Sequence, residues 1–247
     1  MAPVIVNRAK GLYAEARRTP SAVLLFVQLA GIVIYPFLGN EGLGRAMVSI
    51  FGLLVLGLAV AAVRMTPALT WVAWLLGLPV VVLTLLEAVM PENEGLVLVS
   101  AAFHAAFYFY TAYALIKYMF EDDHASRDEL WATGSTFTVV AWGFAYVFVA
   151  VQILWPGSFT AAVDPEDART WVELLFLSVT TLSSTGLSDI VPVTPHGRSF
   201  VMLEQIAGML YLALVVSRMV ALTTLRIASR HAAEREAAHK PTEEPGA

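Results

Sequence analysis

The sequence predicts an all-α membrane protein with six membrane-spanning helices, and three observations carry this prediction. Hydrophobic residues make up 58% of the 247 residues and charged residues only 14%, whereas a soluble domain carries about 25% charged residues. The mean hydropathy is +0.70. Six apolar runs approach the roughly 20 residues that a helix needs to cross a bilayer.

The predicted spans follow one another along the chain, and turn-forming or charged residues separate them. Gly39–Gly42 ends the first run, and Met90–Glu94 follows the third. The linker at 121–129, after the fourth span, is the most charged internal stretch. A short apolar stretch at 171–182 precedes the last span. The six spans are expected at 22–38, 47–63, 68–89, 95–118, 132–154 and 198–222.

The distribution of charge predicts the orientation, because basic residues are retained in cytoplasmic loops. Lys and Arg precede the first span, separate the second from the third, flank the linker after the fourth and follow the sixth, whereas the alternate loops are mainly acidic. Both termini are therefore expected in the cytoplasm of a multi-pass plasma-membrane protein. The predicted segments are a cytoplasmic N-terminus (1–20), a four-helix membrane domain (21–119), a cytoplasmic linker (120–131), a pore domain (132–225) and a cytoplasmic tail (226–247).

The composition argues against several classes of function. The chain has no cysteine, and therefore neither a disulfide framework nor a thiolate metal site, and its net charge of −5 is not typical of nucleic-acid binding. Glu87, His104 and Glu204 fall on separate predicted spans without metal-ligand spacing. We therefore expect no enzymatic activity, no nucleic-acid partner and no cofactor other than permeant potassium ions. The fourth span lacks the series of arginines that voltage sensing requires, so voltage gating is not expected.

The residues between the last two spans have the arrangement of an ion pore. The stretch at 171–182 is too short to cross the membrane, and as a re-entrant helix it would direct its carbonyl end inward, where partial negative charge favours a cation. The chain is then expected to return outward as an extended strand. Backbone carbonyls of Ser184–Leu187, with the Ser184 hydroxyl, would replace hydration water around the ion. Because one chain forms only one wall, a homotetramer in the lipid bilayer is expected.

The sequence Leu182–Pro192, followed by Pro195–Arg198, resembles the selectivity filter of tetrameric potassium channels, whose pattern is T-L-T-T-V-G-Y-G-D-x-x-P-x-T-P-x-G-R. The resemblance covers about residues 131–225, and the chain is similar to prokaryotic members of the two-helix-pore potassium channel family. It implies a filter for potassium ions at Ser184, Thr185, Gly186, Leu187 and Ser188, supported by Thr181, Ser183 and Asp189.

This sequence departs from the family pattern at most filter positions. A residue with a Cβ at Ser188, in place of glycine, costs about 1–2 kcal/mol if it must be left-handed. Leu187 lacks the phenol that braces the filter in the family. We therefore expect potassium conduction with modest selectivity over sodium. The changed positions are Ser183, Ser184, Thr185, Leu187 and Ser188, and the unchanged ones are Gly186 and Asp189.

Two alternatives remain open for the function. The sequence Ser184–Ser188 is also similar to the pore loops of the Trk/Ktr/HKT potassium transporters, which keep a single filter glycine. This similarity favours a weakly selective sodium and potassium channel as the first alternative. The second alternative is a non-conducting, regulatory membrane scaffold whose altered filter no longer holds ions.

The last predicted span contains further candidate site residues. A carboxylate within the membrane is costly and normally partnered. Glu204 is therefore expected to hydrogen-bond the back of the Ser/Thr run as filter support, to tune charge near the ion path, or to be a satisfied structural residue. Gly208 is expected to be either a hinge of the gate or a site of close helix packing. Leu212 and Val216 follow at helical spacing and are candidate gate residues.

Overall fold

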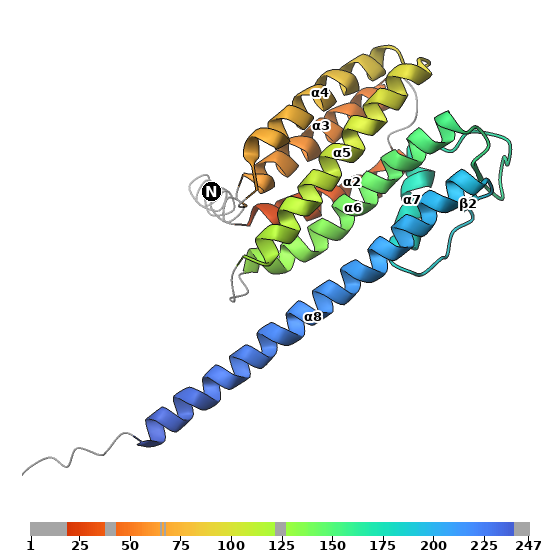
Figure 1. Ribbon diagram of the computed structural model, residues 1–247. Helices are drawn as coiled ribbons and strands as arrows, with labels where there is room; N and C mark the ends of the chain where they lie inside the picture. The colour runs from red at the N-terminus through yellow and green to blue at the C-terminus, as the bar shows by residue number, and fades with distance from the viewer. Residues whose placement is uncertain (1–18, 38–42, 65, 67, 122–126, 240–247) are drawn as a thin grey trace, which may run out of the picture. The chain divides into compact units, whose positions relative to one another are not determined.

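The computed structural model describes residues 19–37, 43–64, 66, 68–121 and 127–239, and the structural statements below concern these residues. The fold is helical apart from one two-stranded ribbon, which confirms the predicted all-α class (Figure 1). Most of the predicted N-terminus, part of the predicted linker and the end of the predicted tail lie outside the described residues. The elements are α2 (Pro20–Ile34), η1 (Tyr35–Phe37), α3 (Leu43–Val63), α4 (Thr70–Val89), α5 (Glu94–Met119), α6 (Arg127–Leu154), β1 (Phe159–Thr160), α7 (Trp171–Leu182), β2 (Val191–Pro192) and α8 (Pro195–His239).

The chain divides into two compact units, residues 1–209 and residues 210–247, and α8 contributes to both. Within the first unit, α5 and α6 pack along each other, α4 packs on α5, and α2 and α7 pack on α6 (Figure 1). Helix α3 lies against α2 and α4. Helices α2 to α7 therefore belong to one compact unit.

Four helices are long and apolar enough to cross a membrane, so the protein is a membrane protein. Helix α4 illustrates the environment that such helices need. Trp71, Trp74 and Leu78 are all more than half exposed on it, whereas a helix facing water carries polar residues at exposed positions. The four segments are Thr70–Val89, Glu94–Met119, Asp128–Leu154 and Pro195–Ala221.

The helices at the first two predicted spans are less complete. Helix α2 has 15 residues and ends at Ile34 rather than at residue 38. Pro36 explains the early end, because proline has no backbone N–H with which to continue the α-helical hydrogen bonds, and Tyr35–Phe37 form a 3-10 turn instead. In α3, the apolar helix identified among residues with described side chains is Ile50–Val63. Membrane spanning by α2 and α3, and thus the count of six, stays a prediction.

Polar contacts fix α2 to α6. The amide and hydroxyl of Ser21 donate to the Asp128 carboxylate at 3.2 and 2.9 Å. The Ser135 hydroxyl donates to the Ser21 carbonyl at 2.5 Å, and the Thr138 hydroxyl donates to the Gln28 side chain at 2.8 Å. All five side chains are buried. Hydrogen bonds of this kind hold helices together where no hydrophobic driving force acts between them, as in a membrane.

A candidate ion pore

Helix α7 begins at Trp171 and ends at Leu182, the bounds predicted from the sequence. A capping box closes its first turn: the Thr170 hydroxyl accepts from the Glu173 amide, and the Glu173 carboxylate accepts from the Thr170 amide at 2.7 Å. This exchange satisfies two amides at the helix start. At about 1.5 Å per residue, the 12 residues of α7 cannot cross a bilayer. The helix therefore has the length of a re-entrant helix, and the filter segment, residues 183–189, follows it.

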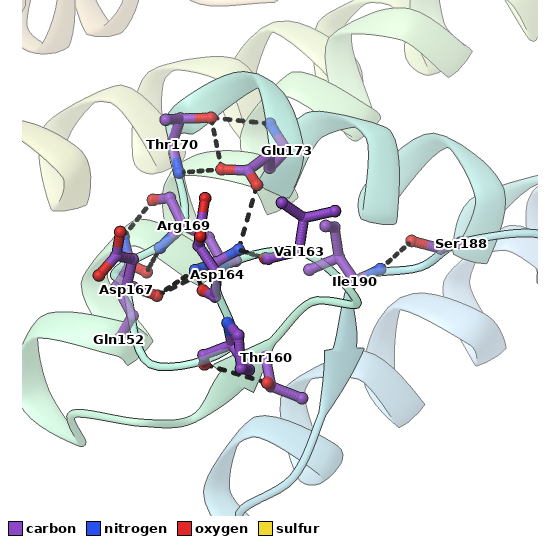
Figure 2. A network of polar contacts seen from close by, with 11 residues as sticks. Gln152, Thr160, Val163, Asp164, Asp167, Arg169, Thr170, Glu173, Ser188 and Ile190 are labelled. Carbon is purple, nitrogen blue, oxygen red and sulfur yellow. Dashed lines mark hydrogen bonds and ion pairs between the residues drawn. The ribbon is translucent and has the colours of Figure 1, made fainter.

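A network of polar contacts holds the start of α7 to the end of α6 (Figure 2). The Gln152 side chain exchanges two hydrogen bonds with the backbone of Arg169, at 2.9 and 3.0 Å. The Arg169 side chain is only 4% exposed. It forms an ion pair with Glu173 at 3.2 Å and donates to three carbonyl oxygens of the preceding loop. These carbonyl oxygens belong to Val163, Asp164 and Asp167.

The Glu173 carboxyl group ionises more readily than that of an ordinary glutamate. Partial burial acts to raise its pKa, but hydrogen bonds from Thr170 and the neighbouring charge of Arg169 outweigh burial and lower the pKa below its usual value. The ionised carboxylate therefore strengthens both the cap of α7 and its attachment to the loop.

The two ends of the pore loop, residues 155–197, are joined to each other. Strand β1 pairs with β2 in the antiparallel sense. The Val193 amide donates to the Ser158 carbonyl at 2.9 Å. A Cβ built on Gly197 would lie 2.9 Å from the same carbonyl oxygen, so this close approach requires glycine. The filter segment is thus part of a loop that is closed at its base.

The first backbone amides of the filter segment point toward the end of α7. The amides of Thr185 and Gly186 both donate to the Thr180 carbonyl at 3.0 Å, and the Ser184 amide donates to the Thr181 carbonyl at 3.0 Å. Ser184 and Gly186 have positive φ angles of 60° and 63°, while Thr185 between them does not. Three successive N–H groups are therefore directed at the last carbonyls of α7.

This conformation differs from the extended strand predicted for the filter. Residues 185–190 have no regular structure, and only β2 beyond them is extended. The reason is that the Thr180 carbonyl lies in the last turn of a helix, where it lacks an intrahelical partner, and it captures two amides of the segment. The left-handed residue expected at Ser188 is found instead at Ser184, where such a conformation costs about 1–2 kcal/mol.

Most carbonyls of the filter segment have no protein donor, although the Gly186 carbonyl accepts from the Ser188 amide at 3.1 Å. Within the described part of the chain, no residue donates a hydrogen bond to the carbonyls of Ser184, Thr185 or Leu187. Ser184–Leu187 are exposed, Leu187 by 79%. Backbone carbonyls in this state are the groups with which channels replace the hydration shell of an ion. The segment can therefore contact a dehydrated cation from one side.

Hydroxyl groups in the filter segment bind local backbone groups. The hydroxyls of Ser183 and Thr185 lie 3.0 Å apart, and both reach the Thr180 carbonyl, at 3.3 and 3.2 Å. The Ser188 hydroxyl accepts from the Ile190 amide at 3.1 Å. The hydroxyls thus brace the turn after α7.

The main anchor of the filter segment, Thr180, was not among the predicted site residues. Its carbonyl accepts from two amides and two hydroxyls of the segment. The predicted support residue Thr181 is buried and contributes its carbonyl, whereas Asp189 is exposed and its side chain bonds to no other residue that the structure describes. The feature of the sequence that could have indicated this anchor is the Thr180–Thr181 pair at the end of the predicted helix.

Helix α8 is anchored to α7 by Glu204, which is fully buried. The Ser178 hydroxyl donates to its carboxyl group and also lies 2.8 Å from the Ala141 carbonyl of α6. Glu204 therefore joins three helices at the body of α7, rather than bonding the back of the Ser/Thr run as one prediction held. Its second carboxyl oxygen has no partner in the described structure. Ser178, like Thr180, was not predicted as a site residue.

Gly208 lies where α8 passes the end of α7. A Cβ built on it would lie 2.2 Å from the Leu182 carbonyl oxygen and 3.0 Å from two further backbone atoms of Leu182. The position therefore provides a close helix contact. Leu212 and Val216 belong to the second unit and are exposed by 42% and 60%. Their role in a gate stays a prediction.

Two residues that the sequence placed on separate spans without shared chemistry, Glu87 and His104, meet through Ser100. The Ser100 hydroxyl donates to the Glu87 carboxylate at 2.8 Å and lies 3.3 Å from His104, whose other ring nitrogen lies 3.3 Å from the Thr84 hydroxyl. They meet because α4 and α5 form an antiparallel pair around the tight turn at 90–93. Among the described residues, no group of three or more acidic or His side chains could hold a metal ion.

Comparison with known proteins assigns the region that contains this site. A family model described as "Ion channel" matches residues 134–224, from α6 through the pore loop to α8. No curated protein and no solved structure matches the chain. The match confirms the resemblance seen in the filter sequence, and leaves the first four helices without an assigned role. Residues 134–224 are thus similar to an ion channel domain, which agrees with the resemblance to potassium channels seen in the sequence.

Proposed function

We propose that the protein is a homotetrameric, cation-selective channel that conducts potassium with modest selectivity. One observation carries this proposal: Thr180 and Thr181 hold the amides of Ser184–Gly186, whereas the carbonyls of Ser184, Thr185 and Leu187 have no donor in the described structure. A scaffold without a conduction role has no need of three unpaired backbone oxygens within four exposed residues of a membrane protein, where unpaired backbone groups are costly.

The mechanism is dehydration of the ion by backbone oxygens. The carbonyl end of α7 adds partial negative charge close to the filter segment. One segment surrounds a quarter of an ion, so four chains related by rotation complete the coordination. Ions held at adjacent sites repel one another, and this repulsion drives exit. Leu187 is 79% exposed and has no hydroxyl to bond a neighbour, so the outer half of the filter adapts to sodium more easily than a braced filter.

The first four helices supply no voltage sensor in this proposal. Helix α5 contains one basic residue, Lys117, whereas voltage sensing requires several charges in the membrane field. The open probability is therefore set by something other than voltage. The termini face the cytoplasm, and the filter segment faces the outside of the plasma membrane.

Purified full-length protein in liposomes tests the proposal. A potassium gradient with an ionophore for protons drives flux through an open channel, and the reversal potential in mixed sodium and potassium gives the selectivity. Gly186→Ala is the informative variant, because Gly186 has φ +63° and nothing within 4 Å of a built Cβ. The substitution therefore strains the filter backbone without a clash inside the chain.

Gly157→Ala is the matched control, because Gly157 has φ +74° and equally open surroundings, outside the filter segment. Both substitutions carry a similar conformational cost of about 1–2 kcal/mol. We expect Gly186→Ala to lose most potassium flux or its selectivity, and Gly157→Ala to keep both. Absence of flux through the wild-type protein supports the scaffold alternative, and equal behaviour of the two variants contradicts the filter assignment.

A further inference from the structure

A cavity of about 400 Å³ lies within the first unit, away from the filter segment. Its walls come from the ends of α2 and α4, the starts of α5 and α7, the middle of α3 and the second half of α6. No residue of 180–189 lines it. Its volume lies in the range of small-molecule sites, which is roughly 300–1,000 Å³. The cavity therefore has the size of a binding site that is distinct from the ion path.

Aromatic rings form one corner of the cavity. The rings of Trp142 and Trp171 meet edge to face, with centroids 5.1 Å apart at 80°. Tyr146 and Tyr35 lie 5.7 and 6.3 Å from Trp171, at 48° and 47°. All four residues line the cavity. The faces of aromatic rings attract organic ammonium groups through cation–π interactions, and the His104 ring already stacks on Tyr146 at 4.2 Å.

One carboxylate in the cavity wall has no cationic partner. Glu87 lines the cavity and accepts a hydrogen bond from Ser100 at 2.8 Å. The other charged residue of the wall, Arg169, is already paired with Glu173. No ion pair involves Glu87 among the residues whose side chains the structure describes. Glu87 is half-buried, and a partly desolvated carboxylate is stabilised by a nearby positive charge, so a cation in the cavity would supply what Glu87 lacks.

Two hydrogen-bond donors of the wall are also unused. The indole nitrogens of Trp142 and Trp171 are buried and have no acceptor in the described structure. Buried donors without acceptors are rare and costly. An oxygen atom on the same ligand would satisfy one of them. The cavity therefore combines aromatic faces, one unpaired carboxylate and free donors.

We propose that this cavity binds an organic ammonium ion that carries an oxygen acceptor a few bonds away. The ammonium group lies against the ring of Trp171 and balances Glu87, and the oxygen accepts from an indole N–H. An amino alcohol and the headgroup of an aminophospholipid share this chemistry. Because Trp171 is the first residue of α7, the ligand contacts the helix that carries the filter segment. The proposal does not depend on conduction.

Binding of radiolabelled choline to the purified full-length protein tests the proposal, with its neutral carbon analogue 3,3-dimethylbutanol as competitor. The protein is placed in nanodiscs of phosphatidylglycerol, which has no amine, with potassium present to occupy the filter. We expect saturable choline binding that the neutral analogue does not displace. Glu87→Gln keeps an acceptor for Ser100 but removes the charge, and Trp171→Leu removes a ring. Each should weaken binding by about tenfold or more.

Matched controls lie outside the cavity. Glu92→Gln removes an exposed acid from the turn after α4, and Trp74→Leu removes a ring that is 54% exposed. Both should bind choline as the wild type does. A second arm uses nanodiscs of phosphatidylcholine: a lipid occupant blocks free choline there and stays bound to the wild type, but not to Glu87→Gln, in native mass spectrometry.

The outcomes separate the possibilities. Choline binding in phosphatidylglycerol that phosphatidylcholine leaves unchanged identifies a free amino alcohol, and competition by the lipid identifies a headgroup. The proposal is overturned if choline does not saturate in phosphatidylglycerol and no phosphatidylcholine is retained, if the neutral analogue competes equally, or if Glu87→Gln and Trp171→Leu bind like their controls.

Discussion

Replacement of Gly208 by alanine tests the packing of α8 on the end of α7. The built Cβ lies 2.2 Å from the Leu182 carbonyl oxygen and 3.0 Å from two other backbone atoms. Favourable contacts begin near 3.5 Å, and a backbone obstacle cannot turn aside as a side-chain end can. Helix α8 and the end of α7 must therefore separate locally by about 1 Å, since the nearest contact falls short of a normal one by that amount.

The magnitude follows from two opposing terms. Alanine gains about 1 kcal/mol over glycine from helix propensity, and overpacking of a tight site costs about 1–3 kcal/mol, occasionally more. Because the obstacle at Leu182 is backbone, we expect the upper part of this range and a net loss of about 2 kcal/mol. For a chain of this size, that loss lowers the apparent melting temperature by about 4–8 °C.

The assay is thermal unfolding of the purified protein in one mild detergent, paired with the selectivity measurement in liposomes. Gly57→Ala is the control, because nothing lies within 4 Å of a Cβ built there, and alanine in this open helical position should be neutral or stabilising by up to about 1 kcal/mol. Leu182 directly precedes the filter segment, so Gly208→Ala should also alter selectivity. Equal melting temperatures and equal selectivity for the two variants would refute the reasoning.

Three further predictions concern neighbouring positions. Ser184 is left-handed with φ 60°, so Ser184→Gly should raise the unfolding free energy by about 1 kcal/mol. Ser188→Gly should not raise it, because φ is not positive at Ser188. The denaturant midpoints of the two variants check this prediction. Glu204→Gln should keep the link to Ser178 and fold as the wild type does, whereas Glu204→Ala should lower the melting temperature, because it leaves a cavity and removes the partner of Ser178. The pKa of Glu173 is lowered in the folded protein, so the stability that its ionised carboxylate contributes is complete above its unfolded-state pKa of about 4.3 and is lost as pH falls through its folded-state pKa. The difference in unfolding free energy between wild type and Glu173→Gln should therefore be constant at neutral pH and shrink only below about pH 4.3.

The bounds of α7 were predictable because local signals agree there. Thr170 and Glu173 have the spacing of a capping box, and the apolar stretch ends where Ser and Thr become frequent. The end of α2 was less predictable, because apolar composition continues past Pro36 while the helix does not. Apolar composition indicates that a segment lies in an apolar environment, whereas proline limits the backbone conformations that the segment can adopt. At Pro36 the two signals give different ends for the helix.

The conformation of the filter segment could not be derived from residue types. A positive φ is expected at glycine, and Gly186 follows that rule, but Ser184 does not. The family pattern placed the strained residue at Ser188 because glycine stands there in relatives. What decides the outcome is the Thr180 carbonyl, which is left without a helical partner and fixes Thr185 and Gly186 above it.

The contacts of Ser100 with Glu87 and His104 could not be predicted by considering each helix alone. Each residue, considered alone on an apolar helix, has only the ordinary interpretation of a buried polar group. The turn at 90–93 pairs α4 with α5 in opposite directions, so Glu87, three residues before the turn, meets Ser100, which lies seven residues beyond it. A comparison of polar positions across that turn would have predicted their proximity, and with it the polar wall of the cavity.

The filter segment and the cavity are connected through one helix. Trp171 at the start of α7 lines the cavity, and Thr180 near its end holds the amides of the filter segment. Between them, Ser178 is tied to both α6 and Glu204 of α8. A helix held at its start, its middle and its end transmits a displacement at one end as a rigid element, so a ligand that shifts Trp171 must either move the filter segment or break the Ser178 contacts. Glu204→Ala removes one of these contacts, and it should therefore change how strongly occupation of the cavity alters the filter, which flux measurements with and without choline can detect.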